Sequence, residues 1–353
     1  MLHCGKPLGY RLRVPRRWEG RKMGPIAPDP PARQRPRSVS SMKPLYRTAF
    51  SLAQWALGLA ALAWALSEVD LGMLCEAVQS YSLAAMMPVF ALAIADYTCM
   101  GFRLNALMPK GTGLALSMKG CLLCVGMNCL LPAKAGDALK ILYLTRNTGQ
   151  SFVTISSVVI WERLCDVIYL ASLLLFAVPN MQADELGVNM VVPAFVLCAG
   201  VLGFYTLRHW SGFFHALYAR FLPSRIASPL SHLHSCMVDQ VSIPWLARGL
   251  AWSACTWGTY FMCFVFSLYM ADIHLTYPQM LVAFTISCLG TAIPSLPGGI
   301  GLFEGAVVLA LSWFGVDASQ ALGMALFFHA VHFLPLALAA VIINGRARYW
   351  QKA

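Results

Sequence analysis

The chain has 353 residues, of which 58% are hydrophobic and 12% are charged, and its mean hydropathy is +0.64. Soluble domains carry about 25% charged residues, so this composition argues against a water-soluble enzyme and indicates a polytopic membrane protein. The net charge of +11 does not indicate a nucleic-acid-binding fold, because residues 1–44 alone carry +9. We therefore expect no nucleic-acid partner.

Residues 1–44 are predicted to form a disordered basic tail. They contain 8 prolines and 11 Lys or Arg residues, without hydrophobic periodicity and without the apolar run of a secretory signal. Met42 is a more natural start before the first membrane helix, so residues 1–41 are interpreted as an over-long gene prediction. The alternative is a basic anchor to anionic lipid. Residues 45–353 then form the membrane domain.

Apolar segments of membrane-helix character follow along the rest of the chain. A helix needs about 20 residues to cross a membrane, and several segments reach that length. The sequence therefore predicts an all-α integral membrane protein with spans at 48–66, 83–102, 114–131, 151–178, 191–207, 245–270, 279–293, 302–314 and 318–343.

The distribution of charge between these spans predicts their orientation. Loops 67–82, 179–190 and 271–278 contain acidic residues and no Lys or Arg. By the positive-inside rule, both termini are cytoplasmic, and the basic segments that lie on the same side are 103–113, 140–150 and 208–244.

Two apolar segments are interrupted by the same pattern. Residues 293–304 read IPSLPGGIGLFE and residues 131–137 read LPAKAGD, so a Leu-Pro pair is followed by glycine four residues after each proline. Proline and glycine break a helix, and broken backbone at membrane depth is tolerated only where protein or a wet cavity covers it. The breaks therefore mark a candidate site.

The predicted orientation makes the two broken segments re-entrant hairpins. Segment 114–145 begins and ends inside, whereas segment 279–316 begins and ends outside. The flanking helices repeat too, so 83–178 and 245–343 are predicted to be inverted helix–hairpin–helix repeats, as in many secondary transporters. The alternative is that the short pattern recurs by chance and every span crosses simply.

Three charged residues lie about ten residues into the apolar helix 151–178. Glu162 and Asp166 share a helix face, and Arg163 is three residues from Asp166. Each charge at membrane depth costs about 2.5–3.5 kcal/mol on insertion scales, so a functional site is the first hypothesis. The alternative is an ion pair that only holds helices together.

The break segments supply the other candidates for a substrate-binding site. New helices are predicted to begin near Gly136 and Gly301, and helix N-termini suit a phosphate or carboxylate. Arg163 would complete such an anion site, and Glu304 is interpreted as the partner of a buried cation. Lys134 and Lys140 are either site residues or residues at the hairpin mouths. The full set is Asn128, Lys134, Gly136, Asp137, Lys140, Glu162, Arg163, Asp166, Pro297, Gly298, Gly299, Gly301 and Glu304.

Weaker signals lie elsewhere. Asp96 and Arg103 share a helix side, and Arg103 is expected to extend to the membrane surface. His329 and His332 are either proton relays or satisfied buried side chains. The CxxC motif at Cys121 is expected to pack rather than bind metal. No cofactor, metal or catalytic residue is predicted, because nucleotide and hydrolase motifs are absent from the sequence.

Three ordered motifs resemble one known family. The run 128–137, the Glu162-Arg163-x-x-Asp166 motif and the run 294–304 resemble the lysylphosphatidylglycerol synthase transmembrane (flippase-like) family over about residues 45–345. The resemblance implies a lipid-handling protein of the bacterial inner membrane. It covers a stand-alone membrane domain without the synthase domain, so we expect no synthase activity. Relatives act in several lipid pathways, including that of hopanoid-type lipids.

The sequence thus predicts an inner-membrane lipid translocation or transport factor. Its partner is a membrane lipid, anionic or isoprenoid-type, whose headgroup binds at the hairpin tips, with lipid-biosynthesis enzymes as possible protein partners. The alternatives are an integral-membrane lipid-modifying enzyme that uses Glu162 and Asp166 as an acid–base pair, and a non-transporting partner of a lipid-biosynthesis complex.

Overall fold

The computed structural model describes residues 83–109, 112–131, 134–180, 191–292 and 296–346. Contacts divide the chain into Met1–Pro44 and Leu45–Ala353, and every described residue belongs to the second unit. The predicted tail, span 48–66, loop 67–82 and the centres of both breaks lie outside the described residues.

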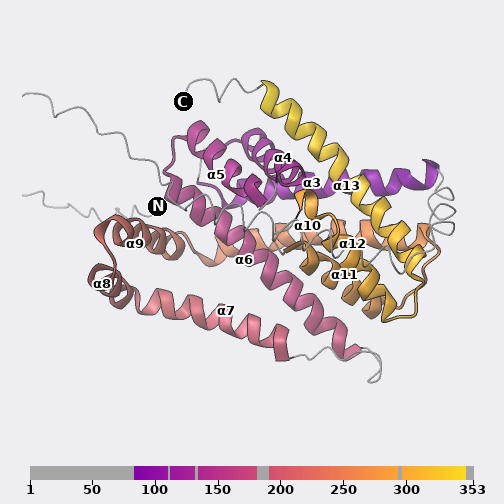
Figure 1. The fold of residues 1–353 in the computed structure, drawn as a ribbon. Coiled ribbons are helices and arrows are strands. Elements are labelled where there is room, and N and C mark those ends of the chain that lie inside the picture. The colour runs from indigo at the N-terminus through magenta and orange to yellow at the C-terminus, as the bar shows by residue number, and fades with distance from the viewer. Residues whose placement is uncertain (1–82, 110–111, 132–133, 181–190, 293–295, 347–353) are drawn as a thin grey trace, which may run out of the picture. The chain divides into compact units, whose positions relative to one another are not determined.

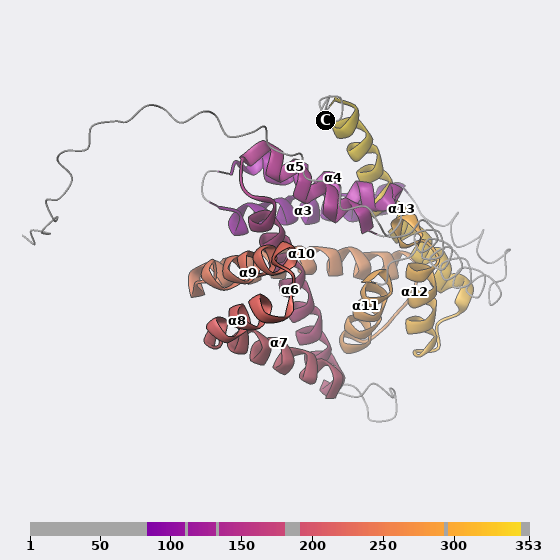
Figure 2. The same ribbon diagram turned by 60° about the vertical axis from the view of Figure 1, so that its left-hand side comes forward.

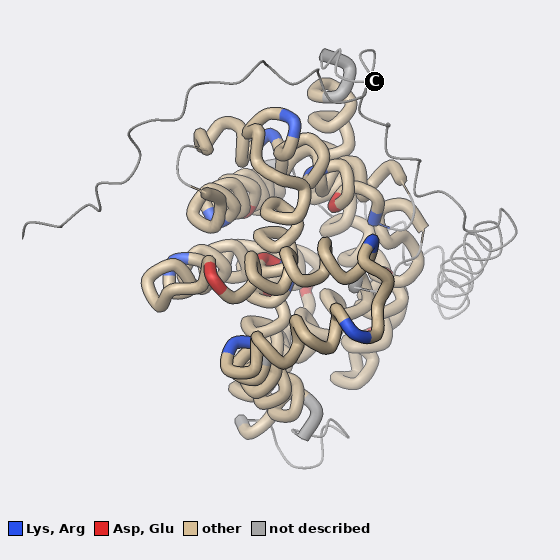
Figure 3. The backbone as a smooth tube through the Cα atoms, turned by 90° about the vertical axis from the view of Figure 1, so that its left-hand side faces the viewer, with Lys and Arg blue, Asp and Glu red and all other residues tan. Residues whose placement is uncertain are grey.

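Every regular element in these ranges is a helix (Figure 1). Figure 3 shows that charged residues occupy few positions along the helices. The α-helices are α3 (Leu83–Leu107), α4 (Leu114–Leu130), α5 (Ala135–Thr148), α6 (Phe152–Ala177), α7 (Val191–His209), α8 (Ser211–Phe221), α9 (Ser224–Asp239), α10 (Ile243–Met270), α11 (Tyr277–Ala292), α12 (Leu302–Ser312) and α13 (Ala318–Arg346). Short 3₁₀ turns are η2 (Val178–Asn180) and η3 (Pro297–Gly299).

The all-helical prediction is confirmed for the described residues, but two loop predictions are wrong. α3 continues through Leu107, so Arg103 lies inside the helix rather than in a loop. The predicted loop 208–244 contains the helices α8 and α9, which have 11 and 16 residues and are too short to have been recognised as membrane spans. Two helices within the described ranges are long and apolar enough to cross a membrane, at Met86–Leu107 and Ala318–Ile343.

Helices from the two ends of the described chain pack against each other in pairs. α3 lies along α10, α4 packs on α13, and α11 packs on α6 (Figure 2). The largest apolar core is built where Phe264, Phe284 and Phe328 meet, on α10, α11 and α13. At the second break, η3 packs against α4.

The helices next to the breaks are short and paired. α4 packs against α5, and α11 packs against α12. α5 has 14 residues and α12 has 11, which at 1.5 Å per residue makes them about 21 and 17 Å long. Both are shorter than the hydrocarbon layer of about 30 Å.

A close helix approach requires glycine at position 136, at the start of α5. A Cβ atom there would lie 2.0 Å from the Cys124 carbonyl oxygen on α4, and the Gly136 N–H donates to Asn128 Oδ1 at 2.7 Å. We expect Gly136→Ala to lower the free energy of unfolding by about 1–3 kcal/mol, because α4 and α5 must separate. Thermal unfolding of the purified protein measures this loss. Gly203→Ala on α7 is the matched control, since open space surrounds a Cβ there. Equal melting temperatures for the two variants would contradict the proposed tight α4–α5 contact.

Candidate functional site

Six charged side chains from α3, α5 and α6 form a closed ring in which cations and anions alternate. Each cation contacts two carboxylates, so three positive and three negative charges balance within the ring. In order, the ion-pair ring consists of Arg103, Glu162, Lys140, Asp137, Arg163 and Asp166.

The inner side of the ion-pair ring is fully buried. Glu162 Oε2 lies 2.7 Å from Lys140 Nζ, and Glu162 Oε1 lies 3.5 Å from Arg103 Nη2. Arg103 Nη1 lies 2.5 Å from Asp166 Oδ1, which also accepts a hydrogen bond from Trp257 Nε1 at 2.8 Å. Buried charges are stable only when paired and hydrogen-bonded, and this geometry provides both. The inner side of the ring therefore locks α3, α5 and α6 together.

The outer side of the ring is open. The Arg163 side chain is 48% exposed although it contacts Asp137 at 3.5 Å and Asp166 at 3.1 Å. Asp137 is 27% exposed and also accepts from Cys124 Sγ at 3.3 Å. Arg163 can therefore present part of its guanidinium to a ligand without leaving the ring.

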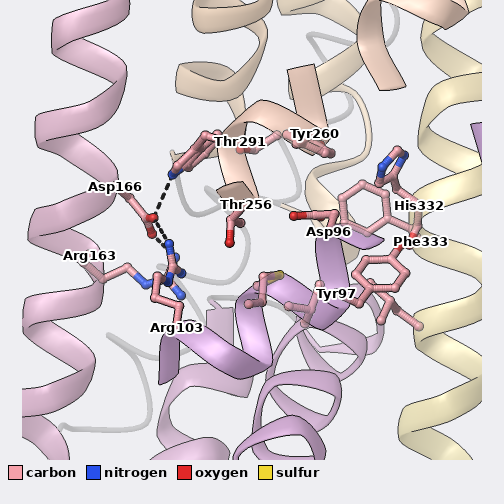
Figure 4. Close-up of a pocket in the computed structure, with 14 residues that line it drawn as sticks. Asp96, Tyr97, Arg103, Arg163, Asp166, Thr256, Tyr260, Thr291, His332 and Phe333 are labelled. Carbon is pink, nitrogen blue, oxygen red and sulfur yellow. Dashed lines mark hydrogen bonds and ion pairs between the residues drawn. The ribbon is translucent and has the colours of Figure 1, made fainter. Parts of the chain in front are cut away.

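Two cavities, each of about 170 Å³, meet at Arg163. The first, which we call the break cavity, lies between the two helix breaks, with Lys134 after the first break and Leu296, Gly298 and Gly299 at the second. The second, the core cavity, lies between α3, α6, α10 and α13 (Figure 4). Arg163, Thr291 and Phe333 are among the residues that line both. The two breaks and Arg163, far apart in sequence, thus surround one hollow region.

The cation nearest the first break has no carboxylate partner. Lys134 is exposed, takes a left-handed backbone conformation with φ 52°, and forms no ion pair with any described residue. The Lys134 ammonium and the open edge of Arg163 are the positive groups that line the break cavity. Together they fit an anion such as a phosphate.

A comparison of the sequence with protein families identifies what kind of protein carries this site. Residues 51–340 match the family described as Lysylphosphatidylglycerol synthase TM region. The chain belongs to this family. No curated protein matches the chain closely enough to be compared with it. Membership of the lysylphosphatidylglycerol synthase transmembrane family makes it a membrane protein related to lipid metabolism or transport.

In this member of the lysylphosphatidylglycerol synthase transmembrane family, side chains of the protein itself bond to the first turns of the two helices that follow the breaks. α5 begins at Ala135 and α12 at Leu302, as predicted. However, the Gly301 N–H donates to Glu304 Oε2 at 2.7 Å, as the Gly136 N–H does to Asn128. One N–H group at each helix start is therefore already bonded to a side chain, whereas Lys134 has no ion-pair partner among the described residues and Arg163 has an exposed edge.

Glu304, predicted to be the partner of a buried cation, contacts a histidine side chain. Its Oε1 contacts His329 Nδ1, and His329 Nε2 lies 3.1 Å from the Gly298 carbonyl oxygen. Each ring nitrogen of His329 thus lies next to an oxygen atom, one of Glu304 and one of the Gly298 backbone. Gly298, with φ 73°, occupies the left-handed region that places its carbonyl there.

We expect Glu304→Ala to lower the free energy of unfolding by about 3 kcal/mol, because it removes the cap of α12 and the partner of a buried histidine. Denaturant unfolding measures the loss. Asp317→Ala, which removes a carboxylate at the start of α13, should cost only about 1 kcal/mol. A Glu304→Ala variant as stable as Asp317→Ala would show that the contact with His329 contributes nothing.

For two residues, the structure excludes one of the alternatives that the sequence left open. Arg103 does not extend to the membrane surface: it is 1% exposed and lies in the ion-pair ring. Lys140 is also 1% exposed, so it does not lie at a hairpin mouth. The sequence does not reveal the partners of Arg103 and Lys140, because Glu162 and Asp166 lie on another helix. The spacing of Glu162 and Asp166 on one face was the available signal that two buried cations were needed.

The remaining predicted residues occupy three positions. Pro297, Gly298 and Gly299 form η3, which packs against α4. Cys121 and Cys124 are buried, and no group of metal-binding side chains occurs among the described residues. Asp96 and His332, which were only weak signals in the sequence, line the core cavity.

Proposed function

We propose that this protein is an inner-membrane lipid translocator or lipid-transport factor that binds an anionic headgroup in the break cavity. The single observation that supports this most is the cavity itself. It brings Lys134, which has no carboxylate partner, and the open edge of Arg163 between two backbone breaks. A phosphate is the headgroup part that these groups fit, and both anionic phospholipids and phosphorylated isoprenoid lipids carry one.

The packing of the helices supports an inverted repeat. The second helix of each half packs on the fourth helix of the other, as α4 does on α13 and α11 on α6, while the first helices α3 and α10 pack on each other. A two-fold axis generates this reciprocal pattern. Lys140–Glu162 and Glu304–His329 also join equivalent helices of the two halves, α5 to α6 and α12 to α13.

The short helix pairs support the re-entrant hairpins. α5 and α12 are too short to cross a hydrocarbon layer. Each packs beside the helix that precedes its break, α5 on α4 and α12 on α11. In this proposal the hairpins enter from opposite faces and their tips bound the break cavity. Rocking of one half against the other then exposes the cavity to each face in turn.

The proposed orientation places both termini in the cytoplasm of a bacterial cell. Arg103 and Lys140 no longer support it, because both are buried in the ion-pair ring. The basic residues in the last turn of α7 and on α8 and α9 still do, since Lys and Arg are retained on the cytoplasmic side; they are Arg208, Arg220 and Arg225. A reporter fused after Arg146 tests the hairpin: the proposal requires a cytoplasmic signal there.

Purified protein in liposomes tests the function. The proposal expects a labelled anionic phospholipid to exchange between leaflets faster than in protein-free vesicles. New lipid species formed without other enzymes would favour the lipid-modifying enzyme. Against that alternative, Glu162 is fully buried and is not among the residues that line the two cavities, so it is not placed to act on a bound lipid.

The non-transporting partner makes a different prediction. There the charges of Glu162, Arg163 and Asp166 hold helices together, and charge-neutral variants that still fold should keep full function. The half-exposed Arg163 facing two cavities favours transport instead, because a purely structural ion pair gains nothing from an open edge.

A further inference from the structure

Asp96 is a buried carboxylate without a partner. It lies on α3, is 5% exposed, and forms no hydrogen bond or ion pair with any described residue. An isolated ionised carboxylate is very unfavourable inside a membrane domain, so such a group must hold a proton or another cation. The ion-pair ring does not provide one, because its own charges already balance.

The core cavity around Asp96 offers other unpartnered polar atoms. Thr256 Oγ1, His332 Nε2 and Arg103 Nε are buried and make no hydrogen bond with the part of the chain that the structure describes, like Asp96 Oδ1 itself. Figure 4 shows the Asp96 carboxylate pointing toward Thr256 across the cavity. His332 Nδ1 lies 3.1 Å from the Phe328 carbonyl oxygen and therefore donates to it, which leaves Nε2 as an acceptor.

The core cavity is large and polar enough for water. Its volume of about 170 Å³ far exceeds the roughly 10–15 Å³ that one water molecule requires, and the four unpartnered atoms are the hydrogen-bond partners that buried water needs. Water that enters from the break cavity side can therefore carry a proton to Asp96.

A metal cation fits this wall poorly. Sodium-like and calcium-like ions are bound by several oxygen ligands, whereas the unpartnered oxygens here are those of Asp96 and Thr256. Tyr97, Trp257 and Phe333 form much of the remaining wall. A proton needs only one carboxylate oxygen, so it is the cation that matches this site.

The charged and titratable groups around Asp96 come from α3, α6, α10, α11 and α13. The positive charge of Arg103, on the same helix, attracts the Asp96 carboxylate. The negative charge of Asp166, on α6, repels it. Those that share the wall are Tyr97, Arg103, Arg163, Asp166, Tyr260 and His332. The thiols of Cys263 on α10 and Cys288 on α11 also interact with Asp96, whereas α4 contributes the apolar Val125 to the wall.

We propose that Asp96 is the proton-binding site of this domain and that its protonation is coupled to lipid translocation. The coupling rests on the proposed function, but proton binding does not. A hydronium ion in the core cavity gives its proton to Asp96 Oδ1, which leaves water and a neutral carboxylic acid. The cavity can then close around an uncharged group, and opening to the other face returns the proton to water.

Infrared titration of the purified full chain in lipid nanodiscs tests proton binding. We expect the carbonyl stretch of a protonated carboxyl group, shifted in D₂O, that titrates with pH and disappears in Asp96→Asn. His332→Gln should move the midpoint of that titration without removing the band. Asp272→Asn, at a 90% exposed carboxylate with φ 57° that asparagine readily adopts, should leave the band unchanged. A band that persists in Asp96→Asn, or a wild-type protein without one, overturns the proposal.

A pH gradient across liposomes tests the coupling. With one proton coupled, one unit of pH difference should shift the leaflet ratio of labelled phosphatidylglycerol up to about tenfold, because one unit corresponds to a tenfold factor in an equilibrium constant. Asp96→Asn should reduce the shift to none, and Asp272→Asn should keep it.

The outcomes separate the two proposals. Wild-type protein that moves the lipid without response to pH overturns the coupling but not the function. Protein that moves no lipid contradicts the proposed function, and the infrared result still decides the proton site. A dependence on sodium, or on a lipid ammonium group, in place of the carboxyl band would show that Asp96 binds that cation instead.

Discussion

Replacing Glu162 with glutamine is expected to lower the free energy of unfolding by about 3–5 kcal/mol, the largest stability effect that we predict. Glu162 is fully buried and bridges Lys140 at 2.7 Å and Arg103 at 3.5 Å. The neutral amide leaves one positive charge in the ion-pair ring uncompensated at membrane depth. Denaturant unfolding of the purified protein measures the change.

A double substitution separates loss of a pair from loss of a charge balance. Removing Lys140 as well, in Glu162→Gln/Lys140→Met, restores equal numbers of cations and anions in the ring. We expect the double variant to be more stable than Glu162→Gln alone, because an uncharged pair avoids the desolvation of a lone ammonium. Losses that simply add would show that Glu162 and Lys140 act independently.

Replacing Arg163 with alanine is expected to slow lipid movement by about 10- to 100-fold, the largest functional effect that we predict. A hydrogen bond to a charged group contributes about 1.5–3 kcal/mol, and each 1.4 kcal/mol is a factor of ten. Arg163 is half-exposed and lines both cavities, so stability should fall less than in Glu162→Gln. Leaflet exchange of labelled phosphatidylglycerol in liposomes measures the rate.

Two further variants define what Arg163 contributes. Arg163→Lys keeps the charge but loses the planar fork, so an intermediate rate is expected. Arg248→Ala removes an exposed arginine on α10 that does not line either cavity, and should exchange lipid at the wild-type rate. An Arg163→Ala protein that folds and keeps the wild-type rate would remove Arg163 from the proposed site.

The sequence predicted the features that depend on the chemistry of single residues rather than on distant partners. Proline and glycine near 132 and 297 predicted the helix breaks, because those residues disturb a helix whatever surrounds them. The three charges on α6 predicted a site in the bundle interior, because an unpaired charge at membrane depth is costly. The helices end near both breaks as predicted, and Glu162 and Asp166 are buried, whereas the Arg163 side chain is 48% exposed.

Partner-dependent features could not be predicted from the sequence. Arg103 is held by carboxylates 59 and 63 residues away, and no periodicity records that pairing. A single carboxylate on an apolar helix, such as Asp96, is compatible with many roles until the side chains around it are known. The helix N-termini were expected to be free donors, and the side chains of Asn128 and Glu304 that satisfy them became evident only in three dimensions.

The central claim, that a lipid headgroup occupies the break cavity, is tested most directly by photo-crosslinking. An anionic phospholipid with a photoreactive group in its headgroup is incorporated with the purified protein into liposomes, and labelled peptides are identified by mass spectrometry. We predict labels on peptides from both breaks, at Leu131 and Lys134 and at Leu296 and Gly299, and weaker labelling in Arg163→Ala. Labels confined to exposed apolar positions such as Phe195 and Leu202 on α7, unchanged by Arg163→Ala, would contradict the claim.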